Sequence, residues 1–335
     1  MSPAPYVIPP FPYADLLEKG PFNDWRDDLA RDGYVVVPNV ISADKAKEYR
    51  TRAFDWVSSF GRGFDHSKPE TYGQEFMPKY NRGGMMPAYG IHHEQWVWDI
   101  RCEPGVKAAF AKLWGTDKLV SSFDTAAIML PGPPKPPSAD DSWHHIDLNP
   151  SRKGFFVAQG LVNLNENGPD DGGLAVMKGS SKLMKEFFDV HGRPPVPPEG
   201  AKLDTYGFTV ADKDWFFARG CEWLKVCAGP GDLILWDSSC MHQGNPPKPG
   251  GRDRVITYVC MGPAHLVSEK DRAVRTKAWD DRKGTSHPPF GGPFEMNNIP
   301  IREETGKPDP DIYARKNSVK VTDDVLRLAG ILDYE

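Results

Sequence analysis

The stretch Ser142-Trp143-His144-His145-Ile146-Asp147 decides which fold this chain can adopt. It contains a His-x-Asp triplet, and residues i and i+2 of an extended strand point to the same face. His145 and Asp147 would therefore present an imidazole and a carboxylate side by side. One further histidine would complete the two-histidine, one-carboxylate set that holds Fe(II) and leaves coordination positions open. The adjacent His144 would face the other way, as a packing or hydrogen-bonding residue.

His242 is the histidine best placed to complete this set. It follows a Gly-Pro-Gly-Asp turn at 229–232 and an apolar strand over 233–236, and we expect it at the far end of that strand. Gly244 and Asn245, just beyond it, are typical turn residues. This arrangement suits a metal at the mouth of a β-barrel.

Two arginines follow His242, and either could hold the far carboxylate of a dicarboxylic co-substrate through a bidentate ion pair. Arg252 and Arg254 share strand parity with Ile256, so parity alone does not choose between them. Arg254 is preferred because it directly adjoins the apolar strand that begins at Val255.

Short apolar segments separated by turns dominate the chain, which contains 33 prolines and 32 glycines. Periodicity predicts strands over 34–38, 118–130, 155–164, 172–177, 233–236 and 255–261, and helices over 24–32, 43–60, 105–114, 182–190 and 322–331. Residues 91–100 favour a helical turn, and periodicity fades after 262. The pattern indicates a mainly β fold with flanking helices, either a β-sandwich or a double-stranded β-helix of the jelly-roll, cupin-like type.

Composition narrows the class of protein. The chain has 335 residues, of which 39% are hydrophobic and 26% charged, with a net charge of −5 and no basic block, which argues against nucleic acid as a partner. No apolar run is long enough for a membrane span, and no secretory signal is recognisable. The five cysteines form no Cys-x-x-Cys pair, which favours reduced thiols in a cytoplasmic protein.

Four segments, in order, resemble the phytanoyl-CoA dioxygenase family of Fe(II)- and 2-oxoglutarate-dependent oxygenases. They are Asp32-Gly33-Tyr34-Val35-Val36-Val37-Pro38-Asn39-Val40-Ile41-Ser42, Trp143 to Asp147, Asn167 to Ser181, and Gly231 to His242 followed by Asn245 and Arg254. The family's Pro-Gly-Ser-His is replaced here by Lys178-Gly179-Ser180-Ser181, a change in a turn rather than in a ligand. Together the segments span about residues 24–262.

The resemblance implies a double-stranded β-helix in which His145, Asp147 and His242 bind Fe(II). It further implies that 2-oxoglutarate and O2 are co-substrates, that Arg254 pairs with the 5-carboxylate of 2-oxoglutarate, and that Gln159 contacts the co-substrate. The expected reaction is oxidation of a small organic molecule, such as a secondary metabolite, most simply by hydroxylation, with decarboxylation of 2-oxoglutarate to succinate. Related halogenases have a small residue at the carboxylate position, so Asp147 favours hydroxylation.

The expected organisation is one oxygenase domain over 1–335. Its parts would be a helical N-terminal part with the first strands (1–130), a metal-binding β-helix core (131–262) and a C-terminal extension (263–335). The candidate substrate-pocket residues are His92, Trp98 and Trp143. Two alternatives stay open: a non-catalytic β-barrel that binds a small molecule, and a zinc hydrolase that uses the same three ligands. The sequence does not indicate an oligomeric state.

Overall fold

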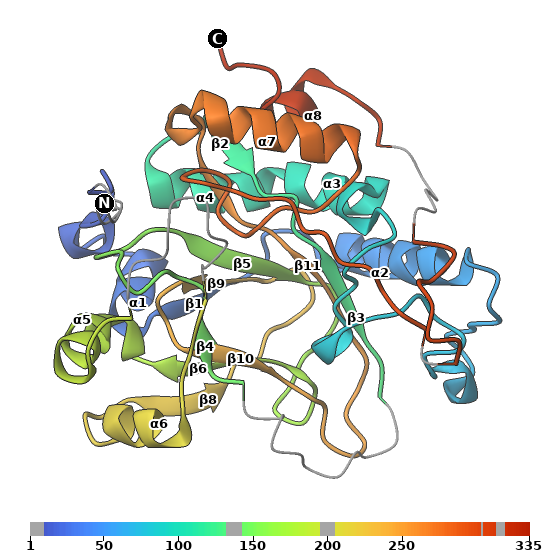
Figure 1. Cartoon of the computed structure of the whole chain (residues 1–335), viewed down its shortest axis with the longest axis horizontal. Helices are drawn as coiled ribbons and strands as arrows, with labels where there is room; N and C mark the ends of the chain where they lie inside the picture. The colour runs from blue at the N-terminus through green and yellow to red at the C-terminus, as the bar shows by residue number, and fades with distance from the viewer. Residues whose placement is uncertain (1–9, 132–142, 195–204, 303, 313–318) are drawn as a thin grey trace, which may run out of the picture.

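Two antiparallel β-sheets face each other in the computed structural model, which describes residues 10–131, 143–194, 205–302, 304–312 and 319–335 (Figure 1). The large sheet has the spatial order β1 (Tyr34–Val37), β9 (Leu233–Asp237), β5 (Ala158–Asn163), β11 (Arg254–Tyr258) and β3 (Ala126–Met129). The small sheet has the order β7 (Tyr206–Gly207), β4 (His145–Ile146), β10 (His242–Asn245), β6 (Gly173–Lys178) and β8 (Glu222–Lys225). A separate pair joins β12 (Met261–Pro263) to β2 (Leu119–Ser121).

The chain passes back and forth between the two sheets. Strands β3 and β5 belong to the large sheet while β4 and β6 belong to the small one, and the same alternation recurs in β8, β9, β10 and β11. Repeated crossing of this kind is the topology of a double-stranded β-helix, or jelly roll. The predicted fold class is therefore confirmed.

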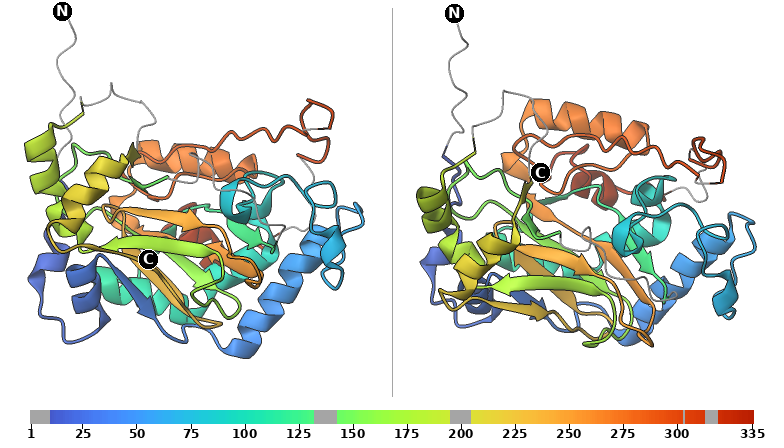
Figure 2. Two further views of the ribbon diagram at one scale, coloured as in Figure 1. Left: turned by 90° about the horizontal axis from the view of Figure 1, so that it is seen from below. Right: turned by 60° about the horizontal axis from the view of Figure 1, so that its bottom comes forward.

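Helices cover the outer side of the large sheet and both ends of the sandwich. They are α1 (Trp25–Asp32), α2 (Ala43–Ser58), α3 (Gln95–Cys102), α4 (Pro104–Trp114), α5 (Ser180–His191), α6 (Val210–Phe217), α7 (Glu269–Asp280) and α8 (Asp323–Leu328). Short 3-10 turns occur at Leu16–Lys19, Pro69–Thr71, Arg82–Gly84, Ile91–His93 and Ala264–Leu266. Figure 1 shows α3, α4 and α7 on one side of the large sheet and the small sheet on the other. In Figure 2, α5 and α6 flank one end of the small sheet and α2 the other.

Strand periodicity divides the interior into two apolar cores. On β9, Leu233 and Leu235 pack into the core that includes the helices, whereas Ile234 and Trp236 pack into the core between the sheets. Both faces of the strand are covered, so it reads as a continuous apolar run rather than an alternating one. Within the described residues, no helix combines the length and apolar character needed to cross a membrane.

Local signals explain the helix ends that were predicted correctly. The Asp24 side chain accepts a hydrogen bond from the Arg26 amide at the start of α1, and Gly33 ends that helix with a left-handed φ of 81°. Ser42 caps α2 by accepting from the Lys45 amide. These capping residues are visible in the sequence because each helix terminus leaves backbone groups that need partners.

Several predicted elements differ from the structure. The predicted strand over 118–130 is two strands, β2 and β3, in different sheets, and that over 255–261 is likewise β11 and β12. Helix α7 lies where periodicity fades, although Ser268 and Asp271 form a capping box at its start. The predicted boundary at residue 131 borders a segment, 132–142, outside the described residues.

Candidate metal centre and co-substrate cavity

Strand pairing brings the two predicted histidine ligands together. Strands β4 and β10 are antiparallel neighbours, and His145 stands opposite His242 in their register. The Nε2 atom of His145 lies 3.6 Å from Oδ1 of Asp147, and Nε2 of His242 lies 3.3 Å from Oδ2. One ligand atom from each residue lies within 4.8 Å of the others. The structure therefore places one carboxylate and two imidazoles around a common point.

The secondary structure that positions Asp147 and His242 differs from the predicted one. Strand β4 ends at Ile146, so Asp147 lies just beyond it, where its amide donates to the carbonyl of Ser238. His242 opens strand β10 instead of ending β9, because the chain turns between them and crosses to the small sheet. Gly244 and Asn245 are consequently strand residues rather than turn residues.

Backbone carbonyls fix the orientation of both imidazole rings. Nδ1 of His145 lies 2.8 Å from the carbonyl oxygen of Trp143, and Nδ1 of His242 lies 2.9 Å from that of Cys240. A carbonyl can only accept, so each Nδ1 carries the proton and donates it. Each Nε2 then keeps its lone pair on the side of Asp147, which is the tautomer that a metal ligand requires.

Burial and neighbouring charge set the ionisation of the cluster. Burial alone would raise the pKa of Asp147, but the adjacent imidazoles, foremost that of His145, outweigh burial and hold this pKa well below its usual range. Burial, followed by the proximity of His145, lowers the pKa of His242. An ionised carboxylate beside a neutral imidazole is the donor set that a divalent cation needs.

Gln159 lies beside the carboxylate and not only along the cavity wall. Its Nε2 donates to Oδ2 of Asp147 at 3.0 Å, and both residues line the same cavity. Gln159 is therefore hydrogen-bonded to a candidate metal ligand. The predicted contact with the co-substrate stays a prediction.

Arg254 reaches the same cavity from β11. The side chain is buried, and its Nε and Nη2 atoms have no hydrogen-bond partner among the described residues. These two atoms form one edge of the guanidinium, the edge that binds a carboxylate in a bidentate pair. Burial lowers the pKa of Arg254, and only the neighbouring Tyr258 opposes this effect. The structure thus holds an unpaired buried cation in the cavity, which is costly unless a ligand anion meets it.

The other candidate arginine is already paired. Arg252 donates from Nε and Nη2 to Oδ2 of Asp171 at 3.1 and 2.7 Å, and its side chain is 52% exposed. It precedes β11 and does not line the cavity. Arg254 is therefore the better candidate for the anchor.

The three predicted substrate-pocket residues do not lie together in the structure. Trp143 lines the metal cavity, where its ring stacks on His145 at 4.3 Å between centroids with an interplanar angle of 5°. Trp98 is fully buried and packs against Trp279, and His92 lines a different cavity of about 170 Å³. Neither Trp98 nor His92 lines the metal cavity, and their role in a substrate pocket stays a prediction.

One cavity residue that the sequence does not mark is His287, which lies in the C-terminal part. It follows Thr285 and Ser286 and precedes two prolines, so no strand or helix periodicity marks it. Tyr258, which lies within the strand predicted over 255–261, also lines this cavity.

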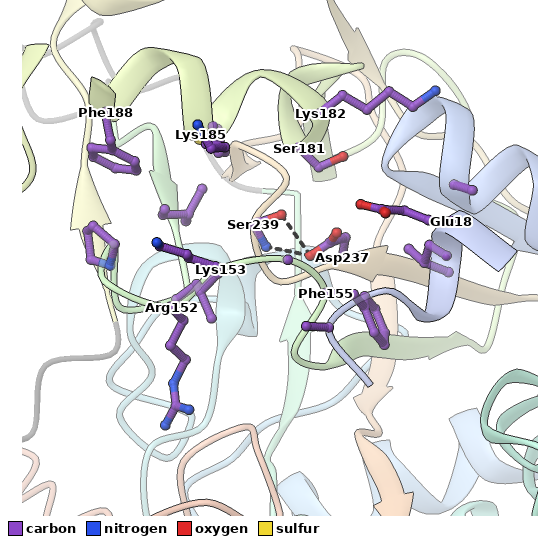
Figure 3. Close-up of a pocket in the computed structure, with 18 of the residues that line it drawn as sticks. Glu18, Arg152, Lys153, Phe155, Ser181, Lys182, Lys185, Phe188, Asp237 and Ser239 are labelled. Carbon is purple, nitrogen blue, oxygen red and sulfur yellow. Dashed lines mark hydrogen bonds between the residues drawn. The ribbon is translucent and has the colours of Figure 1, made fainter. Parts of the chain in front are cut away.

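A second, larger cavity of about 480 Å³ lies on the opposite side of β4 (Figure 3). Ile146 and Leu148 line it, and these alternate along the chain with His145 and Asp147. Figure 3 shows Asp237 in this cavity, where Ser239 donates to it from both its amide and its hydroxyl. The metal cavity measures only about 90 Å³, but it alone of the two contains the candidate ligands and Arg254.

Comparisons with known proteins agree with this geometry. The sequence profile described as phytanoyl-CoA dioxygenase (PhyH) matches residues 29–252. The chain is 39% identical over 268 residues to Ava biosynthesis cluster protein O of Aspergillus versicolor, covering 79% of this chain and 85% of that protein. It is 22% identical to a putative phytanoyl-CoA dioxygenase of Dictyostelium discoideum, covering 71% and 74%.

Similarity to solved structures extends over nearly the whole fold. The crystal structure of GlcNAc Inducible Gene 2 (GIG2) from Candida albicans superposes with a TM-score of 0.57 at 13% identity, covering 97% of this chain and 83% of that chain. At this identity the likeness shows a shared fold and nothing about substrate. The profile match spans the candidate metal ligands, and the extent of the sequence identity settles the family. The chain belongs to the phytanoyl-CoA dioxygenase family of Fe(II)- and 2-oxoglutarate-dependent oxygenases.

Proposed function

We propose that this oxygenase hydroxylates a small organic molecule, with His145, Asp147 and His242 as the iron ligands and Arg254 as the anchor of 2-oxoglutarate. One observation carries the proposal: a His-Asp-His cluster shares one cavity with a buried guanidinium whose Nε and Nη2 atoms have no partner in the part of the chain that the structure describes. A carboxylate at one end of 2-oxoglutarate suits the guanidinium, and its keto acid end suits a cation with open coordination positions. When bound, the iron supplies the oxidising chemistry with O2.

The residues of this chain would act by holding and orienting. The two histidines keep their Nε2 lone pairs toward the metal because their Nδ1 protons are engaged by backbone carbonyls. Gln159 restrains the free rotation of the Asp147 carboxylate. Arg254 fixes the far end of the co-substrate, and the apolar walls provided by Met85, Met129 and Trp143 keep that ion pair away from bulk water.

The substrate proposed is a small, largely apolar molecule of a biosynthetic pathway. Apolar side chains supply most of the cavity surface near the cluster, and the name of the Aspergillus versicolor relative places that protein in a biosynthesis cluster. Asp147 occupies a position that a halogenating relative would need to leave open, which supports hydroxylation as the outcome.

Release of succinate from 2-oxoglutarate tests the proposal. Protein loaded with Fe(II) is expected to form succinate slowly even without a substrate, and the His145→Ala variant is expected to lose this activity. Arg252→Met serves as a matched control that should retain it. Normal succinate release by His145→Ala would overturn the ligand assignment.

Two alternative functions predict different results. A non-catalytic binding protein would show neither succinate release nor a charge-transfer band with Fe(II) and 2-oxoglutarate. A zinc hydrolase would be active with zinc and inactive with iron. The unpaired Arg254 favours the oxygenase, because a hydrolase using the three ligands has no need of a buried carboxylate anchor.

A further inference from the structure

His287 lies outside the region that the family profile matches, yet its side chain enters the metal cavity. The profile ends at residue 252, and every candidate iron ligand lies inside it. The role of His287 therefore depends on this chain's own C-terminal segment.

Backbone hydrogen bonds fix the segment that carries His287. The Thr285 amide donates to the carbonyl of Phe123 at 3.1 Å, and the Phe123 amide donates to Oγ1 of Thr285 at 3.0 Å. The segment folds back on itself, since the Ser286 amide donates to the carbonyl of Phe294. Phe290, 1% exposed, packs so closely on Gly262 that a Cβ there would lie 2.1 Å from its ring. The position of His287 is thus set by the fold on both sides.

The imidazole of His287 is held between two carboxylates. Its Nδ1 lies 2.6 Å from Oδ2 of Asp124, a hydrogen bond to a buried acid on the segment before β3. Arg101 in turn donates to the backbone carbonyl of Asp124 at 2.5 Å, which restrains that residue from the helix layer. On its other side, Nε2 of His287 lies 3.6 Å from Oδ2 of Asp147.

The oxygen that faces His287 is the one that Gln159 also holds. Gln159 approaches Oδ2 of Asp147 from β5 at 3.0 Å, and His287 approaches it from the C-terminal segment. His287 is not part of the group whose ligand atoms lie within 4.8 Å of one another, so it is not placed as a fourth ligand. Groups that contact ligands in this way orient them and raise metal affinity.

We propose that His287 is a positioning residue for the metal centre: clamped by Asp124, it restrains the carboxylate of Asp147 in the orientation that binds the cation. This inference rests on the proposed function for the identity of the ligand. It deepens that function by assigning part of the metal site to the C-terminal segment, beyond the residues that the family profile matches.

Titration with Co(II), a redox-stable substitute for Fe(II), tests the proposal without turnover. The sharpest variant is His287→Asn, because an asparagine amide can still donate to Asp124 from near the Nδ1 position but carries nothing at the Nε2 position. Its Co(II) dissociation constant is expected to rise about 10- to 100-fold. Asp124→Asn, which keeps the imidazole but loosens its hold, is expected to show a smaller rise. His265→Asn, on an exposed 3-10 turn, is the matched control and should bind as the wild type does.

Metal affinity and the melting temperature without metal together distinguish two roles of His287: positioning Asp147, or only docking the C-terminal segment. If His287 only docked the C-terminal segment, His287→Asn would bind Co(II) within about twofold of the wild type, and the inference would be overturned. A His287→Leu variant supplies a second comparison, since it is expected to lose Co(II) affinity and also to melt at a lower temperature without metal. Wild-type protein that binds Co(II) but gives no charge-transfer band with Fe(II) and 2-oxoglutarate would overturn the proposed oxygenase function alone, leaving the affinity contrast intact.

Discussion

Replacing Arg254 by methionine is expected to remove 2-oxoglutarate binding while leaving the fold intact. Two unpaired donors, Nε and Nη2, face the cavity from a buried position. A hydrogen bond to a charged group contributes roughly 1.5–3 kcal/mol. Two of them contribute about 3–6 kcal/mol, which corresponds to a loss of ~10²- to 10⁴-fold in affinity. Methionine keeps most of the side-chain length and has no charge to desolvate.

The same substitution is expected to have the opposite effect on the stability of the protein without ligand. An unpaired buried cation destabilises the fold, and replacing it by an apolar side chain of similar size is expected to raise the melting temperature without ligand. The wild type should be stabilised by 2-oxoglutarate, by about 2.7 kcal/mol at a hundred times the dissociation constant, and the variant should not.

Anaerobic titration of the Fe(II)-loaded protein with 2-oxoglutarate, followed by its visible charge-transfer band, measures the affinity. Arg252→Met is the matched control, because Arg252 is paired with Asp171 at the surface and should leave the affinity unchanged. The reasoning would be refuted if Arg254→Met bound 2-oxoglutarate within about threefold of the wild type, or if Arg252→Met were the variant that lost binding.

Three further substitutions test the surroundings of the site. Gly173→Ala should weaken 2-oxoglutarate binding, because a Cβ there would lie 2.8 Å from Nε of Arg254 at a φ of 138°; an unchanged KM for 2-oxoglutarate would count against this packing. Burial lowers the pKa of His92 from 6.5 to about 4, so the unfolded chain binds the proton more tightly and stability should fall by up to about 3 kcal/mol as pH drops through that window. His92→Gln should show less of this loss in urea unfolding at pH 7 and 4.5, and parallel pH profiles would contradict the assignment. Gln159→Leu should raise the metal dissociation constant about tenfold, because Asp147 loses the hydrogen bond that orients it. Calorimetric titration with Co(II) measures this constant, and an unchanged value would contradict the orienting role of Gln159.

Local sequence signals predicted the candidate metal ligands because those residues lie close to strand or turn features. The His-x-Asp spacing gave His145 and Asp147, and an apolar strand followed by a short turn gave His242. Strand parity accounts for only part of the pairing of His145 with Asp147, since β4 is two residues long and Asp147 lies beyond it. What places Asp147 is the hydrogen bond from its backbone amide to the carbonyl of Ser238, a contact between distant parts of the chain.

Long-range contacts explain what the sequence could not supply. Arg252 and Arg254 are equivalent by strand parity, and only the presence of Asp171 beside one of them separates their roles. His287 has no periodic neighbours, and its place in the cavity depends on a hydrogen bond to Asp124, far away in the chain. Sequence patterns report which face of an element is buried, whereas these roles depend on which other segment covers that face.

The most direct test of the central claim is an anaerobic titration that counts ligands. Protein freed of metal is mixed with Fe(II) and then with 2-oxoglutarate, and the visible charge-transfer band is recorded alongside bound iron. We expect one iron and one 2-oxoglutarate per chain in the wild type, and neither the band nor the iron in His145→Ala and His242→Ala. A wild type that binds no iron or forms no band, or a band of full intensity in either histidine variant, would contradict the account.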